Sequence, residues 1–126
     1  MKLIIEGPPV TKKNSPRILR TRHGGRFVAP SARYEAWEKW ALLQLGGQMV
    51  RARAPTIETP VNLRALIYRK RNAGDLDNYL AAICDALQKA RVVRNDKLIA
   101  GHDGSRLLVH RERPRVEIEL TPLEAP

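Results

Sequence analysis

Cysteine and aromatic residues are scarce in this sequence. Cys84 is its single cysteine, and only 5% of its 126 residues are aromatic. One thiol cannot form a disulfide or a cysteine-based zinc site within the chain. The flanking run Ile83–Leu87 predicts a small core residue on a helix rather than a catalytic thiol.

Long hydrophobic runs are also missing. No stretch approaches the roughly 20 apolar residues that cross a bilayer. Residues 1–8 hold too short an apolar segment for a signal peptide, so we expect no membrane partner and a cytoplasmic protein. With 43% hydrophobic and 29% charged residues, the chain is expected to form a single domain over residues 1–126.

Acidic residues are in the minority: 13 Asp and Glu stand against 23 Lys and Arg, which gives a net charge of +10. The excess is local, because residues 1–33 carry eight basic residues and one acid, Glu6. Solubility is one explanation, but such a cluster favours binding to nucleic-acid phosphates. A membrane surface is the weaker alternative, since these residues do not line one face of an amphipathic helix.

Most of this basic cluster lies in an aperiodic segment from Val10 to Pro30, which predicts a long loop. The pattern at 26–28 predicts a short strand within it, after the turn signal Gly24-Gly25. Long loops in compact domains tend to be functional. The residues that we expect to contact phosphates here are Lys12, Lys13, Arg17, Arg20 and Arg22.

The rest of the chain alternates between strand and helix patterns. Strands are predicted at 2–6, 61–68, 107–110 and 116–120, with brief pairing at 98–100. One helix is expected from the N-cap Ser31 to Gly46-Gly47, and a second over residues 76–90. Trp37 and Trp40 on the first helix are expected in the core, with base stacking as the alternative. These elements indicate an α/β (α+β) fold.

The most informative motif is Asp75-Leu76-Asp77-Asn78, which opens the second helix and is followed nineteen residues after Asp77 by Asp96. A lone aspartate there would be explained by helix capping. Two close carboxylates repel one another unless a cation lies between them, and Mg²⁺ takes such oxygen ligands together with substrate phosphate. Asp75, Asp77 and Asp96 therefore predict a metal-dependent nuclease, provided that the turn at 94–97 packs beside the helix start.

Other charged residues surround this motif. Lys70 and Arg71 form a basic turn just before it and are further candidates for DNA contact. Asp85 lies eight residues after Asp77 on roughly the same side of the helix. Two interpretations of Asp85 stay open: it supports the metal site from outside the ligand set, or it is a solvated surface group.

These motifs resemble the RusA-type Holliday junction resolvases of bacteria and their phages. The resemblance covers nearly the whole chain and rests on runs at 5–17, 74–78, 84–87 and 95–99. It implies a homodimer with a mixed sheet flanked by two main helices. It also implies an enzyme that uses Mg²⁺, with Mn²⁺ as the alternative, to cut four-way junction DNA by paired symmetric nicks. Asp75, Asp77 and Asp96 would be its metal-binding catalytic acids.

The chain departs from the family at one position. The family typically carries a catalytic lysine four residues after the second aspartate, where this sequence has Ala81. Lys70, Arg71 or Lys97 is a candidate to supply the missing cation. Two alternatives stay open: a catalytically weak protein that binds branched DNA, and an RNA-binding basic protein whose aspartates only cap a helix.

Overall fold

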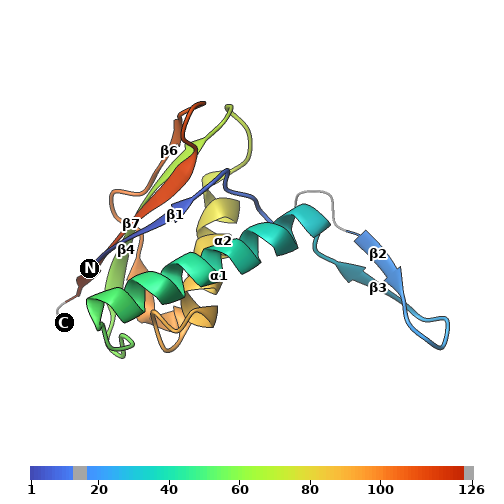
Figure 1. Cartoon of the computed structure of the whole chain (residues 1–126), viewed down its shortest axis with the longest axis horizontal. Helices are drawn as coiled ribbons and strands as arrows, with labels where there is room; N and C mark the ends of the chain where they lie inside the picture. The colour runs from blue at the N-terminus through green and yellow to red at the C-terminus, as the bar shows by residue number, and fades with distance from the viewer. Residues whose placement is uncertain (13–16, 124–126) are drawn as a thin grey trace.

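A mixed sheet forms the centre of the computed structural model, which describes residues 1–12 and 17–123 (Figure 1). Its strands are β1 (Lys2–Glu6), β7 (Arg115–Pro122), β4 (Val61–Arg69), β5 (Ile99–Gly101) and β6 (Arg106–Val109). Strand β7 is antiparallel to both β1 and β4, whereas β5 and β6 pair with β4 in parallel. The expected mixed sheet is therefore confirmed.

Two long helices, α1 (Ala32–Ala52) and α2 (Leu76–Lys89), complete the main body. Leu45 of α1 and Ile83 of α2 share one core with inward-facing strand residues such as Leu63 and Ile118. Helix α2 makes the crossover between the parallel strands β4 and β5, and the short 3-10 helix η1 (Asp96–Leu98) follows it. Within the described ranges, no helix is both long and apolar enough to span a membrane.

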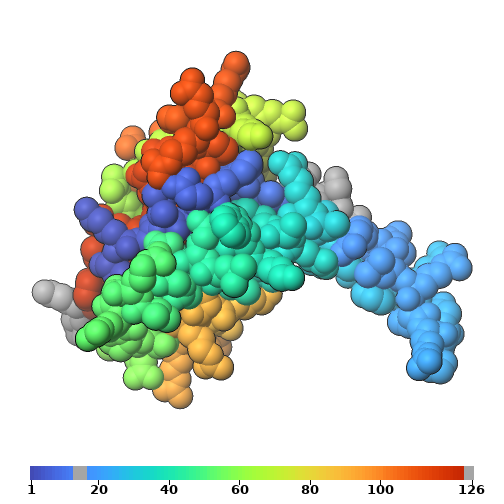
Figure 2. Space-filling model, viewed as in Figure 1, coloured from blue at the N-terminus to red at the C-terminus, as the bar shows by residue number. Residues whose placement is uncertain are grey.

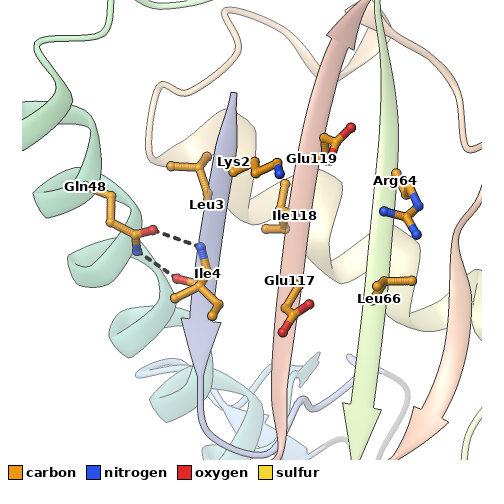
Figure 3. A pocket seen from close by; sticks show the side chains of 9 residues that line it. All are labelled: Lys2, Leu3, Ile4, Gln48, Arg64, Leu66, Glu117, Ile118 and Glu119. Atoms are coloured by element: carbon orange, nitrogen blue, oxygen red, sulfur yellow. Dashed lines mark hydrogen bonds between the residues drawn. The ribbon is translucent and has the colours of Figure 1, made fainter.

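Helix α1 begins as predicted, because the side chain of Ser31 accepts a hydrogen bond from the Tyr34 amide. The predicted stop at Gly46-Gly47 is wrong, since the helix continues to Ala52. Two glutamines hold it against the edge of β1: Gln44 accepts from the Glu6 amide at 2.7 Å, and Gln48 bonds both the amide and the carbonyl of Ile4 (Figure 3). These tertiary bonds offset the low helix propensity of the two glycines.

The outer face of the sheet is solvated and carries mixed charge. A shallow hollow there brings Lys2 and Arg64 together with Glu117 and Glu119 (Figure 3). Acids and bases alternate across neighbouring strands, so this face offers neither a clustered acid site nor a uniformly basic surface.

The basic segment near the N-terminus forms an arm rather than a loop. Strands β2 (Arg17–Arg20) and β3 (Arg26–Ala29) pair as a separate hairpin that projects from the body (Figures 1 and 2). The predicted strand at 26–28 is confirmed, but the loop predicted at 17–20 is wrong. The turn between the strands is closed by a hydrogen bond of 2.7 Å from the Thr21 amide to the Gly25 carbonyl.

The cysteine and the two tryptophans have separate environments. Cys84 packs against the core as predicted, and burial, followed by Asp96 and Asp85, raises the pKa of its thiol to about 11. The thiol therefore stays protonated at neutral pH. Trp37 is buried as expected, whereas Trp40 is 52% exposed and donates to the Glu6 carbonyl, so its prediction as a core residue is wrong.

Candidate active site

Asp75 and Asp77 lie together at the start of α2. Asp75 is the N-cap residue, yet its side chain accepts no capping hydrogen bond, unlike Ser31 at α1 and Asn95 at η1. Both carboxylates are exposed, and neither forms an ion pair or a side-chain hydrogen bond with any described residue. Helix capping therefore does not explain Asp75, which keeps its carboxylate available for a ligand.

The loop before this motif is held in place from two sides. The Ala73 carbonyl accepts hydrogen bonds from Arg69 Nη1 at 2.8 Å and from the Tyr79 hydroxyl at 3.1 Å. Gly74 has a φ of +85°, and a Cβ there would lie 2.7 Å from a ring carbon of Tyr79. A glycine is thus required immediately before Asp75. The loop fixes the acids at the carboxyl end of β4, where α/β folds commonly bind ligands.

Asp96 lies at the other end of α2. Its backbone amide donates to Gln88 Oε1 at 2.8 Å, and Gln88 is eleven residues, or about 16 Å along the helix, beyond Asp77. The turn at 94–97 was expected to pack beside the start of α2. Within one chain this expectation is wrong, because the turn lies near the end of that helix. The reason is strand pairing: η1 leads into β5, which pairs with the first residues of β4, at Val61.

A metal site formed within one chain would therefore need fewer protein ligands than the three predicted aspartates. Among the described residues, no group of three His, Cys, Asp or Glu is close enough to hold a metal ion. Two carboxylates still fit Mg²⁺, because this ion is typically held by one or two carboxylates, with water and substrate phosphate as its other ligands. Asp75 and Asp77 supply such a pair.

Asp85 is held by lysines. Its carboxylate forms ion pairs with Lys12 at 2.9 Å and Lys89 at 3.3 Å, and Lys89 also bonds Glu38. Burial tends to raise the pKa of Asp85, but the two lysines outweigh it and hold that pKa below its usual value. The carboxylate thus ties the N-terminal segment to α2. Its suggested support of a metal site stays a prediction.

The predicted DNA contacts fall into two groups. Lys12 pairs with Asp85, and Arg17 pairs with Glu35 at 2.8 Å, so these two also have structural partners. Arg20 and Arg22 are exposed on the arm and form no ion pair with any described residue, and the same holds for Lys70 and Arg71 beside the acids. Lys13 lies outside the described residues.

Three further basic residues lie on the arm or beside the acid motif and were not among the predicted DNA contacts. Arg26 lies directly opposite Arg20 in the hairpin, while Arg33 and Arg69 border a cleft beside the acid motif. A signal for Arg69 was present in the sequence: it continues the alternation of Leu63, Ala65 and Ile67, which predicts that its side chain lies on the inner face of the sheet.

Ala81 is exposed one turn after Asp77, so the position of the family lysine is open to solvent. Its candidate replacements lie at different places. Lys70 and Arg71 are on the loop that leads to Asp75, whereas Lys97 is in η1 beside Asp96. Only the first two are therefore close to the acid pair in the same chain.

Comparison with known proteins gives two consistent matches. The family model described as "Endodeoxyribonuclease RusA" matches residues 6–121. The crossover junction endodeoxyribonuclease RusA of Aquifex aeolicus (strain VF5) is 34% identical to this chain over 99 residues, which is 79% of this chain and 74% of that protein. Both matches include the acid motif, α2 and the η1 segment.

Proposed function

This chain belongs to the RusA endodeoxyribonuclease family, and on that premise we propose that it is a Mg²⁺-dependent endonuclease that resolves four-way (Holliday) junctions by paired symmetric nicks in DNA recombination and repair. The observation that carries the proposal is the pair of exposed carboxylates at the start of α2, which have no hydrogen-bond or ion-pair partner among the described residues, in a protein of net charge +10. We further propose Mn²⁺ as an alternative ion, and the cytoplasm of a bacterium as the place of action, with the gene carried by host or phage.

In this proposal, Asp75 and Asp77 hold the metal ion through their carboxylate oxygens. A bound Mg²⁺ would neutralise phosphate charge and lower the pKa of a water molecule. Lys70 and Arg71, on the loop before the acids, bind the phosphates that flank the cut. Arg20 and Arg22 on the arm hold the backbone farther away, and such contacts give affinity without sequence preference.

We also propose a homodimer, in which Asp96 of each copy acts at the site of the other. The separation of Asp96 from Asp77 within one chain supports this arrangement. A two-fold dimer presents two identical sites, as two symmetric nicks across a four-way junction require.

The arm gives the first test of DNA binding. Replacing Arg20 and Arg22 together by glutamine should weaken junction affinity and lower the slope of log K against log salt by about 0.9 for each lost phosphate contact. Fluorescence anisotropy with a labelled junction, in EDTA at several salt concentrations, measures both quantities. The matched control removes two exposed arginines from the body, Arg51 and Arg106. Equal losses in the two double variants would contradict a specific role for the arm.

A second candidate function, binding of branched DNA with little cleavage, is favoured by Ala81. If the missing lysine limits turnover, Ala81→Lys should raise the Mg²⁺-dependent nicking rate about tenfold without changing junction affinity, because the new cation stabilises charge on the phosphate in the transition state. Ala81→Gln controls for side-chain length. If the wild type already nicks fast and Ala81→Lys does not raise the rate, another cation takes the place of the missing lysine. Slower nicking by Lys70→Ala or by Arg71→Ala would identify that cation.

The proposed activity is tested by incubating a labelled four-way junction with the protein and Mg²⁺, with EDTA as the control. Symmetric nicks that ligase can seal are expected. Affinities for junction, duplex and RNA, measured at one stated salt concentration, separate a junction-specific protein from a general RNA-binding one. A preference for RNA without metal-dependent nicking would refute the proposal.

A further inference from the structure

A cleft of about 420 Å³ lies beside the acid motif, between the segment that follows β1, the start of α1 and the loop that follows β4. Its wall includes Gly74 and Tyr79, which fix the position of Asp75, so the cleft borders the proposed active site. Four basic residues line it as well: Arg33, Arg69, Lys70 and Arg71.

The lining of this cleft differs in charge from that of the other hollows. No Asp or Glu is found among the described residues that line it. By contrast, the hollow on the outer face includes Glu117 and Glu119, one beside α2 includes Glu58, and one beside α1 includes Glu6. A concave surface lined by several cations without an acid concentrates anions.

Arg69 is the unusual member of this set. It is only 7% exposed, on the central strand β4, and no carboxylate pairs with it in the part of the chain that the structure describes. Its guanidinium donates to the carbonyls of Ala73 at 2.8 Å and Leu108 at 3.3 Å. An arginine has five N–H donors, so others have no partner among the described residues. Because Arg69 also lines the cleft, these remaining donors are available to bind an anion there.

We propose that this cleft binds one phosphate of the DNA backbone, with Arg69 at its floor and Arg33, Lys70 and Arg71 at its rim. The planar guanidinium suits two-point contact with phosphate oxygens. Because Arg69 also bonds Ala73, a phosphate in the cleft is coupled through one residue to the loop that presents Asp75. This inference rests on the proposed function, and it adds a specific anchor that sets the DNA in register with the acids.

The first measurement is junction affinity as a function of salt for the full chain in EDTA, which separates binding from cleavage. Arg69→Gln is expected to weaken binding about tenfold and to lower the salt slope by about 0.9. Arg69→Lys should keep the slope, because the charge remains, but lose part of the affinity with the two-point contact. Arg33→Gln should act in the same direction as Arg69→Gln. Arg51→Gln is the control, because Arg51 lies at the opposite end of α1 from Arg33, and it should change the junction affinity and the salt slope little.

The second measurement is thermal unfolding with and without inorganic phosphate. Phosphate should raise the melting temperature of the wild type and of Arg51→Gln, but not that of Arg69→Gln. If Arg69→Gln does not fold, Arg33→Gln carries the same test with a smaller expected loss. Wild-type affinity and salt slope in both Arg69→Gln and Arg33→Gln would overturn the inference. If phosphate then still stabilised the wild type but not Arg69→Gln, the cleft would be a site for free phosphate rather than for the DNA backbone. Absence of nicking by the wild type, with these losses present, would instead refute the nuclease function and leave the phosphate site standing.

Discussion

Replacing Asp77 by asparagine is expected to lower the Mg²⁺-dependent nicking of a four-way junction by about 10³-fold, because a bound metal ion contributes several kcal/mol of transition-state stabilisation. Asparagine keeps the size of the side chain and removes its charge. Asp77 forms no ion pair or side-chain hydrogen bond with any described residue, so its replacement leaves the fold intact. Junction affinity in EDTA should be equal to or higher than that of the wild type, since a negative charge near the DNA is lost.

The matched control is Asp103→Asn, which makes the same chemical change at another exposed aspartate that forms no ion pair with any described residue. It should nick at the wild-type rate. Single-turnover cleavage on a denaturing gel, together with anisotropy for binding, measures both effects. Nicking by Asp77→Asn within a few fold of the wild type would remove this carboxylate from the metal site, and with it the main support for the proposed mechanism.

The second large effect concerns Asp96 and the dimer. Asp77→Asn and Asp96→Asn are each expected to be inactive alone, but the two proteins mixed under conditions of subunit exchange should regain nicking. In a mixed dimer, one site receives both substitutions and the other receives neither. With random exchange about half of the dimers are mixed, so the rate should approach about a quarter of the wild-type rate. The products should be single nicks rather than resolved junctions.

A mixture of Asp75→Asn with Asp77→Asn serves as the control, because both acids belong to the same end of α2 and every site then lacks one of them. This mixture should stay inactive. If Asp77→Asn and Asp96→Asn also fail to restore nicking although exchange is demonstrated with differently tagged copies, Asp96 does not act in the other subunit. Full activity of Asp96→Asn alone would remove it from the reaction altogether.

Much of the geometry of the candidate site could be predicted because its signals are local. The apolar period after Asp75 defines α2, and Asp75 and Asp77 follow from their place at its start. The absence of a cation at Ala81 can also be read directly, because four residues along a helix is one turn. Ser31 was predicted as a cap for the same reason, since a side chain that bonds an amide three residues ahead needs no distant partner.

The predictions of secondary structure that are wrong concern elements whose extent depends on residues far apart in the chain. Gly46-Gly47 predicts a helix end, but α1 continues because its side chains bond to β1 on both sides of the glycines. Gln44 accepts from the Glu6 amide, and Gln48 donates to the Ile4 carbonyl. The strand at 17–20 was missed because its stability comes from pairing with β3 rather than from a pattern of its own. Neither partner is visible from local periodicity.

The sequence by itself determined which chemical groups this protein has: a surplus of positive charge, two close carboxylates at a helix start, and a lone cysteine with the pattern of a core residue. Only the tertiary structure decided how these groups are distributed. Pairing of β5 with the first residues of β4 sends Asp96 away from Asp75, and the end of β4 buries Arg69 beside a basic cleft. The physical reason is that the spacing at which side chains return to one face of a helix or strand is fixed by local backbone geometry and can be read from the sequence. The choice of strand partners instead follows from burial of the whole core.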